Sequence, residues 1–309
     1  MSRLAIVEPK TLMGEAVRDG VASPAGIWDE VELFTTDEEE VGGVTEAAGR
    51  AALVQSLQED ALDAFDVVLF CGQEIHQDVL DALPSNCRAI FVDPASPVDG
   101  AVPVVAGINS EEISAAPRVL SPAPAVILLS HLLAPLCRLG SLEVVAHILQ
   151  PASARGKAGV DELFEQTRSI LTMSEDRPED VFGTQLAFNL LPWGGASNPL
   201  AAQLETILGT DLEVRIQLSQ AGVFHCCSAG IFLSTAQDPG AAELQEILLE
   251  SPLIERAEDP EHLGPVSAAT QGKILISDIA PSPVKGYWIW SSMDNLAACA
   301  ENALSLARS

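Results

Sequence analysis

Residues 3–15 have the sequence RLAIVEPKTLMGE, which predicts a short buried strand over residues 4–7, a turn, and a helix over residues 12–20. A strand that leads directly into a helix is the first half of a β-α-β unit. Three more short apolar segments follow at residues 31–35, 67–71 and 89–92, and good helix formers fill residues 47–57. This alternation predicts an α/β fold with a Rossmann-like, doubly wound parallel sheet over residues 1–121.

The pattern changes at Ser121-Pro122-Ala123-Pro124, where prolines in a first turn start an apolar helix over residues 125–137. Longer strands and helices then follow one another irregularly. The expected strands are 142–149, 214–219, 223–233 and 273–278, and the expected helices are 159–171, 200–208, 241–249 and 295–307. We therefore expect an α+β domain with a large mixed sheet over residues 122–291 and a C-terminal helix within residues 292–309.

The charge of the chain excludes several classes of partner. Among its 309 residues, 16 Lys and Arg stand against 44 Asp and Glu, so the net charge is −28. Such a charge repels nucleic acid and anionic membranes. No apolar run reaches the roughly 18 residues that span a bilayer, and the first eight residues do not resemble a signal peptide. We expect a cytoplasmic protein with neither nucleic acid nor a membrane as partner.

The cysteines and histidines show no metal-binding spacing. The six cysteines form no CxxC pair, and the five histidines form no HxxxH or HExxH arrangement. Because most of the cysteines lie in apolar runs, we expect buried free thiols and no metal site.

Several separated segments resemble one enzyme family in the right order. Residues 5–15 match its dinucleotide-binding start, residues 152–163 (ASARGKAGVDEL) resemble its SGAGxxGxxEL loop, residues 185–192 (QLAFNLLP) resemble QxAFNxxP, and residues 294–296 resemble the start of DNLxxGAA. The chain thus resembles the aspartate-semialdehyde dehydrogenase family, and most closely its divergent Usg-type paralogues. The resemblance implies a nucleotide-binding domain, a former catalytic domain that dimerises through its sheet, and a last helix that returns to the first domain.

The same resemblance implies a reaction whose residues are missing here. Family enzymes reductively dephosphorylate an acyl phosphate with NADPH, using a cysteine, a histidine and an arginine. Pro124 falls at the position of the cysteine, Cys227 at that of the histidine, and Gln220 at that of the arginine that binds the substrate carboxylate. No Lys or Arg lies between Arg88 and Arg118 or between Arg177 and Arg215, where the family keeps phosphate-binding cations.

The dinucleotide-binding turn is also altered. The expected GxxGxxG reads Glu8, Thr11 and Gly14, so only the last glycine remains. Lys10 can offset Glu8 only in part, and the acidic run 37–40 after the second strand opposes a 2′-phosphate. We expect no cofactor, or NAD(P) only if this altered turn still binds it. Gly14, Ser153 and Asn295 are then vestiges of the cofactor pocket, although helix capping and loop packing also account for the last two.

Three functions stay open on these residues. The first is a family member without catalysis that acts as a dimeric binding or scaffolding protein. The second is an NAD(P)-dependent oxidoreductase for an aldehyde or acyl substrate with altered chemistry, because a regular strand over 223–232 would place His225 and Cys227 on one face as a relocated thiolate site. The third is a small-molecule sensor that keeps some nucleotide binding.

Overall fold

The computed structural model describes residues 2–309 except 22–26, 59, 75–76, 194–197 and 210–211. The chain forms two compact units: unit 1 comprises residues 1–123 and 299–309, and unit 2 comprises residues 124–298. The boundaries expected from the sequence, after residues 121 and 291, lie two and seven residues before those of the structure, which are after residues 123 and 298. The second differs because helix α8 (Asn295–Arg308) begins in unit 2 and ends in unit 1.

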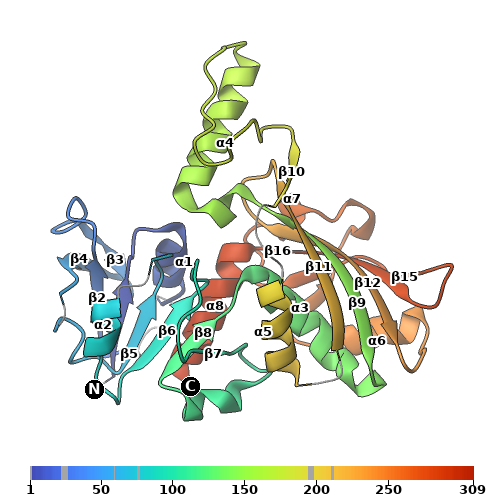
Figure 1. Cartoon of the computed structure of the whole chain (residues 1–309), viewed down its shortest axis with the longest axis horizontal. Helices are drawn as coiled ribbons and strands as arrows, with labels where there is room; N and C mark the ends of the chain where they lie inside the picture. The colour runs from blue at the N-terminus through green and yellow to red at the C-terminus, as the bar shows by residue number, and fades with distance from the viewer. Residues whose placement is uncertain (1, 22–26, 59, 75–76, 194–197, 210–211) are drawn as a thin grey trace. The chain divides into compact units, whose positions relative to one another are not determined.

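Unit 1 is built on one eight-stranded sheet in the order β3-β4-β2-β1-β5-β6-β8-β7 (Figure 1). All its strand pairs are parallel except the β3–β4 pair. The strands are β1 Arg3–Val7, β2 Glu30–Thr35, β3 Val44–Ala47, β4 Arg50–Ser56, β5 Val67–Phe70, β6 Arg88–Val92, β7 Val102–Pro103 and β8 Arg118–Ser121. The helices are α1 Leu12–Val21, α2 Gln77–Ala82 and the last part of α8. The prediction of an α/β fold with a Rossmann-like parallel sheet is confirmed.

The predicted helix over residues 47–57 is wrong, because these residues belong to the β3–β4 hairpin. The two residues that join the strands, Ala48 and Gly49, have φ values of 51° and 72°. Two consecutive left-handed residues form the tight turn that a two-residue hairpin needs, and they end any helix. Arg18 of α1 ties the hairpin to the unit by donating hydrogen bonds to Thr45 Oγ1 and to the carbonyl of Glu46.

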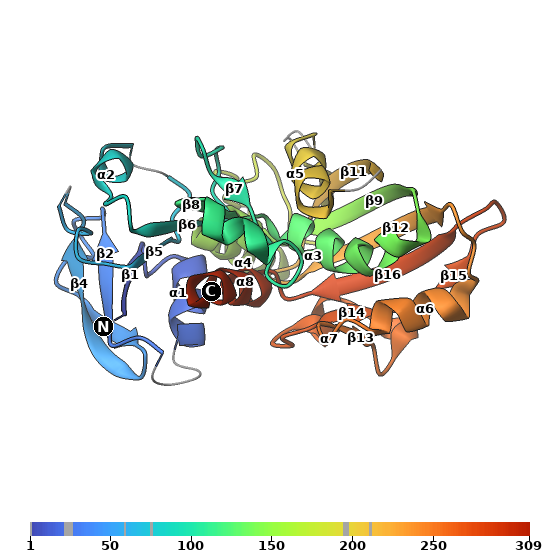
Figure 2. The same cartoon turned by 90° about the horizontal axis from the view of Figure 1, so that it is seen from below.

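The end of α8 is an integral part of unit 1. It lies beside α1 (Figure 2), where Gly20 leaves room for Leu304: a Cβ at Gly20 would come within 2.5 Å of the Leu304 side chain. The buried side chain of Asn302 donates to the carbonyl of Val104 and to Ser121 Oγ, and accepts from the backbone N–H of Ala106. Three otherwise unpaired backbone and hydroxyl groups therefore depend on one amide.

Unit 2 also contains an eight-stranded sheet. Its order is β10-β11-β9-β12-β16-β14-β13, with β15 paired to β16. The strands are β9 Leu142–Gln150, β10 Leu190–Pro192, β11 Leu212–Ala221, β12 Cys227–Thr235, β13 Ile254–Arg256, β14 Ile274–Ile276, β15 Ala280–Pro281 and β16 Tyr287–Met293. β11 is parallel to β9 and β12 is antiparallel to it, so the predicted mixed sheet is confirmed.

The helices of unit 2 are α3 Pro124–Leu133, α4 Gly156–Leu171, α5 Asn198–Leu208, α6 Ala241–Leu249, α7 Pro265–Ala268 and the start of α8. Every residue of α3 is buried. The helix ends before the predicted residue 137 because Pro135 lies in the first turn of a 3₁₀ helix over Ala134–Leu139 and has no N–H to continue the α-helix. In Figure 1, α4 and the segment that follows it stand away from the sheet of unit 2.

No helix in the described ranges is long and apolar enough to cross a membrane.

Replacing Asn302 with alanine leaves the Val104 carbonyl, the Ala106 N–H and the Ser121 hydroxyl without their buried partner. We expect a loss of about 3 kcal/mol in the free energy of unfolding, measured by urea denaturation. Ser305→Ala is the matched control on the same helix, because Ser305 bonds an exposed glutamate and its loss should cost less than about 0.5 kcal/mol. Equal stabilities of the two variants would contradict this role of Asn302.

Candidate functional site

Four of the predicted site residues lie close together in the structure of unit 2. Gln220 is near the end of β11, Cys227 begins β12, Ser153 follows β9, and Asn295 begins α8. Gln220 lies opposite Gln150, the last residue of β9, and Cys227 lies opposite Met293, the last residue of β16. The chain thus brings the predicted positions to one end of the sheet.

Asn295 connects two loops at this end of the sheet through its side-chain amide. Its Oδ1 accepts a hydrogen bond of 2.9 Å from the backbone N–H of Cys226, and its Nδ2 donates to Ser153 Oγ at 3.1 Å. Both side chains are buried. Ser153 and Asn295 therefore have a full structural role in holding the loops after β9 and before β12, whether or not they also meet a cofactor.

The expected strand over 223–233 is wrong at its start, since β12 begins only at Cys227. The carbonyls of Val223 and Phe224 accept hydrogen bonds from the backbone N–H groups of Ala152 and Ser153, and Cys226 has a left-handed φ of 71°. His225 is consequently exposed on a bend, and Cys227 is fully buried. His225 and Cys227 would share one face only if both lay in a regular strand, and His225 lies before β12 begins. They therefore do not form the relocated thiolate pair.

The two adjacent thiols are poor nucleophiles. Burial raises the pKa of Cys227 to about 12, with the neighbouring Cys226 as a smaller cause. Burial and the nearby Asp294 raise the pKa of Cys226 to about 12 as well. The thiolate is the reactive form of cysteine, and at neutral pH almost none is present at such a pKa.

Pro124 begins α3 and is buried. A proline at this position has no side chain that can attack a carbonyl, and it removes one of the free N–H groups at the helix start. His131, in the same helix, is buried, and desolvation lowers its pKa to about 4, so it is neutral at physiological pH.

Gln150 and Gln220 form a buried amide pair. They are 5% and 3% exposed, and Gln220 Nε2 donates to the backbone carbonyl of Gln150 at 3.0 Å. Among the residues that the structure describes, the buried Oε1 atoms of both side chains have no hydrogen-bond partner. Sequence reasoning identified Gln220 and missed Gln150. The sequence did offer a signal for Gln150: it directly follows the alternating strand predicted over 142–149, at the next position that faces the core.

Arg155 is the second residue that the sequence did not reveal. Its guanidinium stacks over the Trp193 ring at 4.0 Å from the centroid, and burial lowers its pKa. No acidic side chain pairs with it in the part of the chain that the structure describes. Trp193 directly follows the segment 185–192, so this region, which has no cation of its own, receives one from the loop after β9.

In unit 1, Gly14 is required by the backbone around it. A Cβ there would come within 2.2 Å of the carbonyl oxygen of Glu8. Glu8 itself has φ 59°, the left-handed conformation that favours glycine. The turn after β1 therefore keeps the backbone shape of a glycine-rich turn, although two of the three glycines are replaced.

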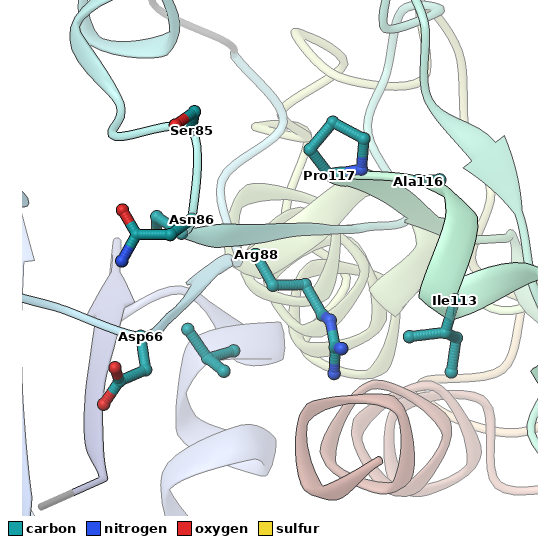
Figure 3. Close-up of a pocket in the computed structure, with 9 residues that line it drawn as sticks. Asp66, Ser85, Asn86, Arg88, Ile113, Ala116 and Pro117 are labelled. Atoms are coloured by element: carbon teal, nitrogen blue, oxygen red, sulfur yellow. The ribbon is translucent and has the colours of Figure 1, made fainter.

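The pocket in Figure 3 lies at the opposite edge of the unit 1 sheet, where β5 and β6 begin. It has a volume of about 500 Å³ and is lined by Asp66, Asn86, Arg88 and Ile113, among others. Ligands of parallel sheets bind at the carboxyl ends of the strands, so this pocket is not the expected nucleotide site. Among the residues placed in the structure, no group of three or more His, Cys, Asp or Glu side chains could hold a metal ion.

Comparison with known proteins places these positions in a family context. Residues 133–298 match the family described as semialdehyde dehydrogenase, dimerisation domain. The aspartate-semialdehyde dehydrogenase of Rickettsia bellii is 28% identical over 278 residues, which cover 82% of this chain and 81% of that protein. A USG-1 protein homolog of Azotobacter vinelandii is 30% identical over 212 residues, 60% of this chain and 62% of that protein.

Among solved structures, a probable aspartate-semialdehyde dehydrogenase from Pseudomonas aeruginosa superimposes with a TM-score of 0.89. The two chains are 23% identical, and the match covers 99% of this chain and 97% of the other. At this identity the likeness establishes the fold alone.

The buried thiols predict a measurable lack of reactivity. At pH 7.5 we expect Cys226 and Cys227 to react with iodoacetamide at least about 100-fold more slowly than a free cysteine, because their pKa of about 12 lies far above the pH. Mass spectrometry of tryptic peptides gives the rate at each site, and labelling in urea, where all six cysteines react, is the control. Rapid labelling of either residue in the native protein would contradict the assignment.

Proposed function

The chain belongs to the semialdehyde dehydrogenase family, and we propose that it is a member that has lost the family's catalysis and acts as a dimeric binding or scaffolding protein. The USG-1 homolog among its relatives supports a place in the Usg-type branch. The observation that carries the proposal is the state of the three aligned positions in unit 2: Pro124, Gln220 and Cys227 are all buried, and none supplies an ionised group.

The chemistry of these three residues supports the loss of turnover. Acyl transfer to the protein needs a nucleophile, and Pro124 has none. Proton transfer near pH 7 needs a group whose pKa lies near that pH, and Cys227 stays protonated with a pKa of about 12. Gln220 is neutral and its Nε2 is already bonded to the carbonyl of Gln150, so it cannot form the bidentate charged contact that an arginine makes with a carboxylate.

The alternative, an NAD(P)-dependent oxidoreductase that uses His225 and Cys227, has less support. It needs a base within hydrogen-bonding reach of an exposed or activated thiol. His225 lies on an exposed bend, whereas Cys227 is buried on the inner face of β12. The unpartnered Oε1 atoms of Gln150 and Gln220 and the stacked Arg155 favour instead a retained ability to bind a small polar molecule in unit 2 without converting it.

The open face of the unit 2 sheet supports a dimer with a second copy of the chain. On this face Phe232 lies opposite both Val145 and Trp288, and the Phe232 and Trp288 rings are 5.3 Å apart. Val145 and Trp288 are 41% and 48% exposed. We call these three residues the apolar row. An exposed apolar row on a protein with a net charge of −28 favours burial against a partner. The match to a dimerisation domain across residues 133–298 supports a second copy of the chain as that partner.

The loss of catalysis is tested by a turnover assay. The purified protein, mixed with aspartate semialdehyde, phosphate and NADP, should form no NADPH above the rate without protein, because Pro124, Gln220 and Cys227 cannot activate the aldehyde. The matched control is Cys227→Ser, which removes the one thiol at the acid/base position. A rate that the wild type shows and Cys227→Ser lacks would overturn the proposal and favour the altered enzyme.

The dimer is tested by light scattering after gel filtration. The wild type should elute at twice the chain mass of 32.5 kDa. Trp288→Arg should shift it to the monomer mass, because burying a charge in the apolar row against a second copy costs more than the contact gains. Leu249→Arg in α6 is the control, since Leu249 is similarly exposed at 40% but lies outside the row. A monomeric wild type, or a Trp288→Arg dimer, would refute this interface.

A further inference from the structure

The carboxylate of Glu8 sits among three hydrogen-bond donors at the carboxyl edge of the unit 1 sheet. Its Oε1 accepts from the backbone N–H and the Oγ1 of Thr36, each at 2.8 Å, and its Oε2 accepts from Thr35 Oγ1 at 2.9 Å. Glu8 directly follows β1, Thr35 is the last residue of β2, and Thr36 directly follows it. One backbone amide and two hydroxyls pointing at one carboxylate form an anion site, and the anion belongs to the chain itself.

This anion site lies where a doubly wound sheet binds nucleotides. In such folds the turn after the first strand receives the pyrophosphate, and the residue after the second strand meets the ribose. Glu8 crosses from the first of these places to the second. The end of β5 also accommodates it, since a Cβ at Gly72 would come within 2.8 Å of Glu8 Cγ. The glutamate side chain is therefore packed into the position that a bound nucleotide requires.

Thr11 occupies a neighbouring backbone donor, the N–H of Gly14, in the same way. Its Oγ1 accepts a hydrogen bond of 3.0 Å from the N–H of Gly14, in the first turn of α1, and donates toward the carbonyls of Glu8 and Cys71. An N–H of the first helical turn is a usual phosphate donor in this fold. Glu8 and Thr11 occupy the first two glycine positions of the turn. The residues present therefore do not fit a nucleotide phosphate.

We propose that Glu8 is an internal ligand, which fills the phosphate and ribose site of unit 1 with its own carboxylate and keeps dinucleotides out. It rests on the proposed function, because a family member without turnover has no need of a bound cofactor. Removal of the Glu8 side chain opens the site to the diphosphate of a dinucleotide. The opened site prefers NAD to NADP, because Asp37 and the three glutamates after it repel a 2′-phosphate.

Glycine is the variant that tests this inference, because it suits the φ of 59° at position 8 without strain. Calorimetric titration of the wild type with NAD should give no binding tighter than about 1 mM. Glu8→Gly should bind NAD at least tenfold more tightly than the wild type, and Glu8→Gly/Thr11→Gly more tightly still. NADP should bind each variant less tightly than NAD does.

Two further variants separate an opened site from a simple change of charge. Glu39→Gln removes one negative charge from the same edge but leaves the Thr35 and Thr36 donors filled, and it should gain no affinity for NAD. Glu8→Asn tolerates a left-handed φ and shortens the side chain, so it serves as a second opening variant if Glu8→Gly unfolds. Circular dichroism of each variant reports whether it is folded.

Folded Glu8→Gly and Glu8→Asn that bind NAD no better than the wild type would overturn the inference. So would a wild type that already binds NAD as tightly as they do, or a Glu39→Gln variant that gains as much as Glu8→Gly. These outcomes concern binding alone. They are distinct from a failure of the proposed function, which would show as turnover by the wild type.

Discussion

Unit 2 depends on the pairing of β9, which bonds to β11 on one side and to β12 on the other along almost its whole length. This double pairing fixes the side of the sheet that each residue faces. Val144, Ala146 and Ile148 point into the core, while Val145 and His147 point to the open face. The same register carries Gln150 to the inner face beside Gln220. The core, the open apolar row and the buried amide pair are therefore three consequences of one set of ladder hydrogen bonds.

Strong periodicity made much of this fold predictable. The alternation in residues 142–149 and the short apolar strands of unit 1 lie where the sequence predicts them, because burial on one or both faces imposes a pattern on the residues. The failures are local. Residues 47–57 contain good helix formers, but two left-handed residues and pairing with β2 turn them into a hairpin. Residues 223–226 read as a strand, but the carbonyls of Val223 and Phe224 are bonded to the loop after β9. Both outcomes depend on partners distant in sequence.

The candidate site was only partly predictable for the same reason. Aligned motifs located Gln220, Cys227, Ser153 and Asn295, because each stands at a fixed distance from a recognisable segment. Gln150 and Arg155 carry no motif of their own. They gain meaning only through a register partner across the sheet and an indole beyond the end of β10. The three donors around Glu8 were likewise not predictable, since Thr35 and Thr36 lie at and after the end of β2, far in sequence from the carboxylate that they bind.

One physical theme links the two units. A ligand site normally keeps buried polar groups unpaired until the ligand arrives, at a cost in stability. Here Glu8 and Thr11 accept hydrogen bonds from the donors at the carboxyl edge of the unit 1 sheet. In unit 2, Gln220 Nε2 donates to the Gln150 carbonyl. A buried arginine at position 220 would need a carboxylate to neutralise it, whereas a glutamine carries no charge and needs only hydrogen-bond partners. Within the described ranges, the Oε1 atoms of Gln150 and Gln220 stay unpaired in this corner of unit 2. Because carbonyl oxygens accept hydrogen bonds, these two atoms favour a ligand that donates, such as a hydroxyl, an amide or an ammonium group, over the carboxylate that an arginine would select.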